Sequence, residues 1–182
     1  MQEYELAPVH TGQAIRMLKE AGAFMLLDHN ERHYLVTEYF ILQLKPRDAW
    51  LIQCGMAVEK RNCYYVKIKK EWQEANKAAD AEAVVERYLS LQTQAEHNPM
   101  LYWTGVAIVQ YRDMAMDGRL YAGMGNYTLL RADYLDMIPG TLEIVRVGDM
   151  AVVNGQHVLT TMPDDAWQEN DFIRHYDGEV EA

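Results

Sequence analysis

The chain has 182 residues, of which 49% are apolar and 24% charged, and its formal net charge is −10. This length and composition predict a globular protein of one or two small domains that buries a substantial core. The acidic balance argues against a dedicated nucleic-acid-binding protein, two cysteines are too few for a disulfide framework and favour a reducing cytoplasm, and no apolar stretch is long enough to span a bilayer.

Sequence patterns in the first half of the chain predict helices and antiparallel strands. An apolar stripe predicts an amphipathic helix that begins after Thr11 and ends at Gly22, where a helix C′ glycine is expected. Asp80 is a candidate N-cap inside a longer helical pattern. In chain order we expect a helix over 12–21, hairpin strands over 24–28 and 33–44, a short helix over 47–53, a strand over 63–70 and a helical region over 71–96.

The second half of the chain is predicted to consist mainly of strands. Asp117-Gly118 predicts a hairpin turn, and Asn154-Gly155 is a strong two-residue turn signal. The glycines of segment 123–126 lack the spacing of a phosphate-binding loop and are expected to let a hairpin bulge or twist. We expect strands over 101–111, 119–130, 142–147, 150–153 and 157–161, with one or two helical turns over 131–138.

The pattern as a whole predicts an α+β fold of antiparallel hairpins with interspersed helices. We expect residues 1–163 to form a single compact domain and residues 164–182 to form a separate acidic segment. Residues 31–42 align weakly with residues 118–129, with identities at Arg32/Arg119, Tyr34/Tyr121 and Leu42/Leu129. A real repeat implies two related helix-hairpin units packed side by side.

The sequence carries no clear catalytic, cofactor-binding or metal-binding signature. His29 and His33 are four residues apart but straddle a predicted hairpin tip, and Cys54 and Cys63 lack the paired spacing of a zinc site. Ser90, the only serine, is predicted to lie mid-helix and not on a nucleophile elbow. We therefore expect no cofactor, no metal and a protein that acts by binding; an enzyme of unrecognised type is the alternative.

A basic segment between residues 60 and 70 is the local exception to the acidity of the chain. Cationic side chains interleaved with tyrosines are used by proteins that bind single-stranded nucleic acids. The alternative is a solvated edge strand, on which lysines discourage aggregation. The candidate nucleic-acid-binding residues are Lys60, Arg61, Tyr65, Lys67, Lys69 and Lys70.

The acidic segment, residues 164–182, holds seven acids and one base and so carries a net charge of −6. Concentrated negative charge attracts Lys/Arg surfaces and repels phosphate. Large apolar residues among the acids are typical of a contact surface with aromatic anchors, whereas a flexible solubilising terminus is the plainer alternative. The candidate partner-binding residues are Asp164, Asp165, Trp167, Glu169, Asp171, Phe172, Tyr176, Asp177, Glu179 and Glu181.

Tyrosine-rich segments 33–40 and 119–127, together with the acidic segment, give the chain its general character. In size, charge and texture it resembles the type II-A anti-CRISPR proteins, with which phages and mobile elements inhibit Cas9. Those proteins share no common fold, so the resemblance transfers no catalytic or binding position. It implies a cytoplasmic phage protein that imitates nucleic acid and occupies the positively charged channels of Cas9.

Two classes of function follow from these patterns. The leading hypothesis is a stoichiometric protein inhibitor of a nucleic-acid-handling defence nuclease, with Cas9 as the suspected partner. The alternative is a DNA-associated phage accessory protein, either clamp-like or single-strand-binding, in which the basic segment contacts DNA. No membrane partner is expected in either case.

Overall fold

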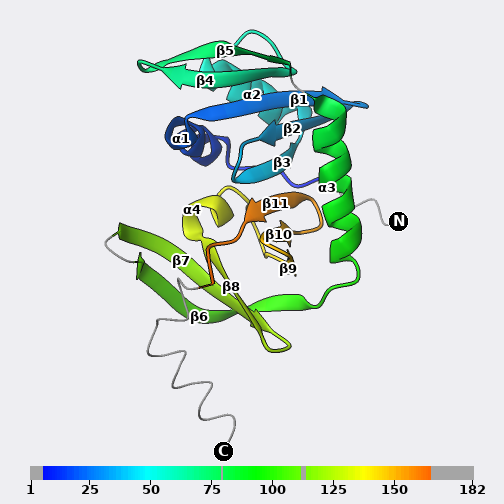
Figure 1. Cartoon of the computed structure of the whole chain (residues 1–182), viewed down its shortest axis with the longest axis vertical. Helices are drawn as coiled ribbons and strands as arrows, with labels where there is room; N and C mark the ends of the chain where they lie inside the picture. Colours follow the sequence, from blue (N-terminus) through cyan, green and yellow to red (C-terminus); the bar gives the residue numbers. More distant parts are fainter. Residues whose placement is uncertain (1–5, 79, 112–113, 165–182) are drawn as a thin grey trace, which may run out of the picture.

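A computed structural model describes the chain over residues 6–78, 80–111 and 114–164 (Figure 1). Helices α1 to α4 span Thr11–Ala21, Pro46–Met56, Ala81–Ala95 and Ala132–Leu135. Strands β1 to β5 span Ala23–His29, Arg32–Val36, Phe40–Leu44, Cys63–Ile68 and Glu71–Ala78. Strands β6 to β11 span Met100–Tyr111, Met114–Gly123, Asn126–Arg131, Ile144–Val147, Met150–Val153 and His157–Thr160. None of the helices in the described ranges combines the length and the apolar character needed to cross a membrane.

The eleven described strands form one antiparallel sheet in the order β5-β4-β1-β2-β3-β11-β10-β9-β6-β7-β8 (Figure 1). The α+β class is therefore confirmed, but the sheet dominates. The expectation of two helix-hairpin units packed side by side is wrong, because the hairpins are joined edge to edge within this single sheet. Strand β11, the last in chain order, lies between β3 and β10 and connects the two halves.

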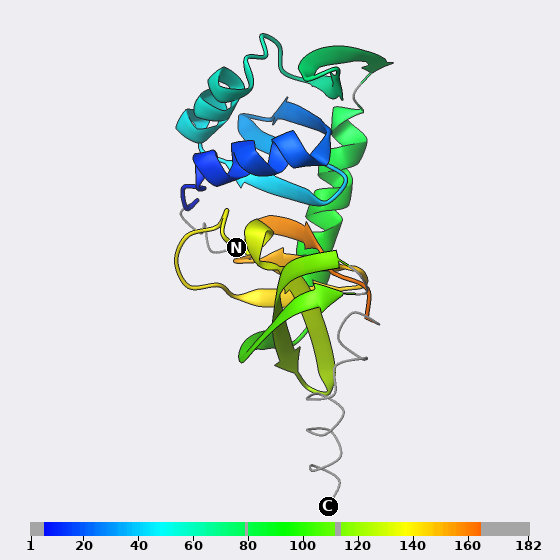
Figure 2. The ribbon, with the colours of Figure 1, turned by 90° about the vertical axis from the view of Figure 1, so that its left-hand side faces the viewer.

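Helices cover both faces of the sheet around β1. Alternate residues of β1 point in opposite directions, so that Phe24 packs with the core under α1 and α2, while Met25 packs with the core under α3. Figure 2 shows α1 in front of the first strands and α3 behind them. Because both faces are covered, β1 carries four consecutive buried residues.

The strand order repeats between the two halves. The first five strands are arranged β5-β4-β1-β2-β3, and the next five are arranged β10-β9-β6-β7-β8, so corresponding strands occupy corresponding places. A helix precedes the first strand of each set, and a second helix follows the third strand. The weak sequence repeat of 31–42 and 118–129 falls mainly on matching strand pairs, β2–β3 and β7–β8, and a duplication stays a prediction.

Two local predictions are wrong because of turns formed by residues other than those expected. Lys69 and Lys70 adopt φ values of 51° and 79°, so the chain reverses and residues 71–78 form β5 instead of the start of a helix. Asp80 then begins α3 by accepting a 3.0 Å hydrogen bond from the backbone N–H of Ala83.

The second error concerns the hairpin of β7 and β8. Asp117 and Gly118 lie inside β7, and the turn is made by Met124 and Gly125, both with positive φ. Gly123 ends β7 where a Cβ would lie 2.7 Å from the carbonyl oxygen of Met100. This close approach brings the β7–β8 turn against the start of β6.

Candidate functional site

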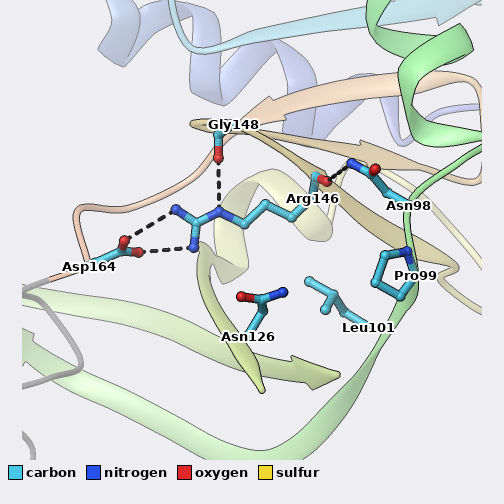
Figure 3. Close-up of a pocket in the computed structure, with 7 residues that line it drawn as sticks. All are labelled: Asn98, Pro99, Leu101, Asn126, Arg146, Gly148 and Asp164. Atoms are coloured by element: carbon cyan, nitrogen blue, oxygen red, sulfur yellow. Dashed lines mark hydrogen bonds and ion pairs between the residues drawn. The ribbon is translucent and has the colours of Figure 1, made fainter. Parts of the chain in front are cut away.

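The acidic segment begins at a side-chain cluster around Arg146 on β9. The Nη1 atom of Arg146 donates to Asp164 Oδ1 at 3.0 Å and to the Tyr127 carbonyl oxygen at 2.8 Å. Its Nη2 atom donates to Asp164 Oδ2 at 3.3 Å, and its Nε atom donates to the Gly148 carbonyl oxygen at 2.8 Å. Figure 3 shows this fork-shaped contact, which fixes the first residue of the acidic segment to the sheet.

A hollow of about 430 Å³ lies beside Arg146, lined by polar side chains and by Pro99 and Leu101 (Figure 3). Asn98 donates from Nδ2 to the Arg146 carbonyl oxygen at 2.8 Å and ties the start of β6 to β9. Because Arg146 already uses all three of its guanidinium nitrogens on Asp164 and backbone carbonyls, the hollow offers no uncommitted arginine to an anionic ligand.

The same region closes one edge of the sheet. The backbone N–H of Met162 donates to the Leu129 carbonyl oxygen of β8 at 2.8 Å, and Arg146 occupies the Tyr127 carbonyl of the same strand. Met162 also packs on a small core made by Ile108, Leu120 and Leu129. The chain leaving β11 therefore covers the outer edge of β8 on its way to Asp164.

Asp164 is the only one of the ten expected partner-binding residues within the described ranges. Asp165, Trp167, Glu169, Asp171, Phe172, Tyr176, Asp177, Glu179 and Glu181 lie outside the described residues.

The structure places the basic segment in the loop before β4, along β4 and at the β4–β5 turn, and pairs two of its five cations with carboxylates. Arg61 donates from Nη1 to both carboxylate oxygens of Asp28 at 3.1 and 3.2 Å, and from Nε to Gln53. Lys60 forms a 2.9 Å ion pair with Glu74 on β5. These two cations are therefore already neutralised by neighbouring carboxylates.

The remaining members of the basic segment are Tyr65, Lys67, Lys69 and Lys70, and they differ in their contacts. Tyr65 is buried and stacks on Phe24 at a ring-centroid distance of 5.3 Å, so its ring is not presented to solvent as a stacking platform. Lys67 donates from Nζ to the Lys19 carbonyl oxygen. Lys69 and Lys70 are exposed at the β4–β5 turn and make no ion pair with another described residue.

The candidate chemical groups near the first hairpin, His33 and Cys63, are held by neighbouring side chains. His33 bonds through Nδ1 to Asp28 Oδ1 at 2.6 Å beside Arg61, and no cluster of metal-ligating residues occurs among the described positions. Partial burial and the neighbouring Glu74 raise the pKa of the Cys63 thiol, which keeps it protonated and a weak nucleophile.

His157 on β11 is a buried histidine without partners. Neither of its ring nitrogens has a hydrogen-bond partner in the described part of the chain, and its side chain lies between Leu42 and Val153 on the neighbouring strands. Burial lowers the pKa of His157 to about 4, because the imidazolium ion loses its hydration there.

A second hollow was missed by the sequence analysis. It shares Leu101 with the Arg146 hollow and is bordered by β6, β7 and the loop before β9. Trp103 and Tyr102 remain 60% and 68% exposed at its edge. The adjacent pair Tyr102-Trp103 could have indicated this hollow. Neighbouring residues of a strand point to opposite faces of the sheet, so two adjacent aromatic side chains are both buried only where both faces are covered.

Comparisons with protein-family models, curated proteins and solved structures gave no match to this chain.

Replacing Arg146 with methionine is expected to lower the free energy of unfolding by about 2 kcal/mol, because several charge-assisted hydrogen bonds to Asp164 and to two backbone carbonyls disappear together. Urea denaturation measures the change. Arg16→Met is the matched control, since Arg16 makes a largely exposed ion pair with Asp133 that is worth at most about 1 kcal/mol. Equal losses for the two variants would contradict a structural role for the Arg146 cluster.

Proposed function

We propose that this protein binds a cationic surface of another macromolecule through its acidic segment and acts by occupying that surface. The observation that carries the proposal is the charge distribution: residues 164–182 hold −6 of the net charge of −10. A compact source of negative charge raises the rate of encounter with positive surfaces and favours their binding.

The anchored start of the acidic segment supports this proposal. Asp164 is held by Arg146 beside the edge of the sheet, so the acidic segment starts at a defined place on the domain. Two cations of the basic segment, Lys60 and Arg61, are not available to the acidic segment, because they are paired with Glu74 and Asp28.

In its most specific form, the proposal is that the partner is a nucleic-acid-handling defence nuclease such as Cas9. This form rests on the resemblance in size, charge and texture to anti-CRISPR proteins. Cas9 holds nucleic acid in positively charged channels, and an acidic protein that competes for them needs neither cofactor nor chemistry. The inhibition is expected to weaken with added salt, because the contacts are between charged groups.

Neutralising the acidic segment is expected to weaken inhibition of guide-loaded Cas9, whereas the intact chain should block target cleavage at near-equimolar amounts. The test variant carries Asn or Gln at Asp165, Glu169, Asp171, Asp177, Glu179 and Glu181. With six charges removed, the inhibitory concentration should rise at least about tenfold, since each exposed ion pair contributes up to about 1 kcal/mol. A DNA cleavage assay with titrated protein measures it.

A matched control separates position from net charge. The control variant replaces six exposed acids of the domain with the corresponding amides. This changes the net charge by as much as the test variant does and should leave inhibition intact. These acids are Glu31, Glu59, Glu82, Glu86, Glu96 and Asp149. Complete cleavage with a tenfold excess of the intact chain would reject Cas9 as the partner. Equal inhibition by the test variant and the intact chain would reject the acidic segment as the binding element.

The DNA-associated accessory protein stays a prediction. Within the basic segment, Lys67, Lys69 and Lys70 are exposed and make no ion pair with another described residue, so they are the groups left to contact DNA. An enzyme of unrecognised type likewise stays an alternative.

A further inference from the structure

A groove of about 510 Å³ between β6, β7 and the loop before β9 exposes aromatic surface. Its lining includes Trp103 and Tyr102 of β6, Tyr121 of β7 and Leu142 of the loop. Trp103 pairs across the ladder with the buried Tyr121, so the indole stands on the same face as a packed ring yet stays 60% exposed. An exposed aromatic side chain in an apolar groove marks a site of interaction with other molecules.

The charges beside this groove favour a cation. Arg119 donates from Nη2 to Asp136 Oδ1 at 2.8 Å, so its positive charge is balanced within the chain. The backbone N–H of Glu143 is held by Asn154 Oδ1 at 2.7 Å, which fixes the loop. The exposed carboxylate of Glu143 forms no ion pair with any described residue, and it lies on the rim of the groove.

We infer that the groove binds an arginine- or lysine-bearing segment of a protein partner. The apolar stem of the partner side chain packs on Tyr121 and Leu142, its cationic head lies against the Trp103 ring, and its charge is met by Glu143. An aromatic surface next to an unpaired carboxylate provides both the cation–π attraction and the counter-charge that such a side chain requires.

This inference rests on the proposed function and deepens it by naming a second contact for the same cationic partner. Leu101 lines both the groove and the hollow where Arg146 holds Asp164, so the aromatic groove and the start of the acidic segment are adjacent. The groove supplies a desolvated anchor and the segment supplies the surrounding negative charge, an arrangement typical of binding hot spots.

Other occupants fit the groove less well. A nucleic-acid strand could stack on Trp103, but its phosphates need cations, and both nearby arginines are committed to Asp136 and Asp164. A second copy of this chain would bring another net charge of −10 to the same surface.

The test uses the full-length protein and a short synthetic peptide that alternates arginine with leucine and proline. A peptide with citrulline in place of arginine is the matched neutral probe. Binding is measured by titration calorimetry, and the site is mapped by NMR shifts of β6 and β7 resonances. We expect the arginine peptide to shift β6 and β7 resonances and to bind at least about fivefold more tightly than the citrulline peptide.

Variants locate the contact. Trp103→Gln and Glu143→Gln should each weaken arginine-peptide binding about fivefold to tenfold. Trp50→Gln should leave it unchanged, because Trp50 is similarly exposed, at 58%, but lies on α2. Thermal unfolding monitored by circular dichroism checks that the three variants fold equally well.

The outcomes separate this inference from the proposed function. If the variant with the amide-substituted acidic segment loses peptide binding and Trp103→Gln does not, the groove is not the binding site, and the proposed function stands. Loss in Trp103→Gln, with none in the amide-substituted segment, supports the groove and counts against the proposed function. Equal binding of the citrulline and arginine peptides would contradict the inference that the groove binds a cationic side chain. Trp103-dependent binding of a single-stranded oligonucleotide, or Trp103-dependent self-association, in place of peptide binding would also contradict it.

Discussion

Replacing Tyr88 with alanine is expected to lower the free energy of unfolding by about 3–5 kcal/mol. Tyr88 is fully buried where α3 meets the sheet, and its ring packs edge-on against Tyr34 at a centroid distance of 5.2 Å. Its hydroxyl donates to Gln43 Oε1 or to the Gln156 carbonyl oxygen, which lie at 3.0 and 2.7 Å. The hydroxyl also accepts from Gln92 Nε2 at 2.7 Å.

The variant Tyr88→Phe distinguishes the contribution of the ring to stability from that of the hydroxyl. It keeps the ring contacts and should lower the free energy of unfolding by about 1–3 kcal/mol, because buried polar groups lose a partner. Burial raises the pKa of Tyr88, so the phenol stays neutral and keeps its proton for donation. Leu89→Ala, on the exposed side of α3, is the control and should change stability much less.

Urea denaturation of the four proteins measures these differences. An alanine variant at Tyr88 that loses less than about 1 kcal/mol would show that α3 does not depend on this anchor.

Acid is expected to destabilise the protein through His157. The histidine binds a proton near its ordinary pKa of 6.5 when the chain is unfolded, but only near pH 4 when it is folded. Between these values the unfolded state binds more protons, so stability falls as the pH is lowered through this window. The full difference corresponds to about 3 kcal/mol below pH 4.

His157→Leu removes this proton linkage and the two unpaired ring nitrogens. At pH 7.5 the variant should be at least as stable as the original chain, because no buried polar atom is left without a partner at this position. Between pH 6.5 and 4 it should lose about 3 kcal/mol less, measured by urea denaturation at each pH.

The background titration of carboxylates is shared by both proteins and cancels in the comparison. His97→Gln, a change in an exposed loop, controls for the loss of a histidine as such. Parallel pH profiles for the original chain and His157→Leu would contradict the linkage.

Local signals in the sequence predicted several elements correctly. Gly22 adopts a φ of 76° at the end of α1, and Asn154-Gly155 forms the turn between β10 and β11 with φ values of 53° and 62°. Asp80 caps a helix as expected. In each case one residue type with a special backbone or side-chain preference determines the structure without help from distant residues.

Predictions failed where distant contacts or unusual turn residues decide the structure. Strand β5 exists because two lysines take up left-handed backbone conformations, for which lysine carries no sequence signal. The pairing of Arg61 with Asp28 joins residues 33 apart and could not be inferred from spacing. Two of the five cations of the basic segment, Lys60 and Arg61, are therefore neutralised in the structure.

The acidic segment and the aromatic groove also differ in how far the sequence predicts them. The concentration of acids in residues 164–182 follows from counting charges alone. The aromatic groove depends on the register that sets Trp103 opposite Tyr121 and on the loop that carries Glu143 to its rim. Neither the register nor the loop position is encoded by a local pattern.

The central place of β11 in the sheet has a consequence for how the chain folds. Within the sheet, the two five-strand sets meet only through β11, which pairs with β3 on one side and β10 on the other. During synthesis on the ribosome, both sets emerge before the strand that joins them, and each carries an unsatisfied edge until residues 157–160 arrive. We therefore expect the sheet to be completed late, by a strand translated more than a hundred residues after β3.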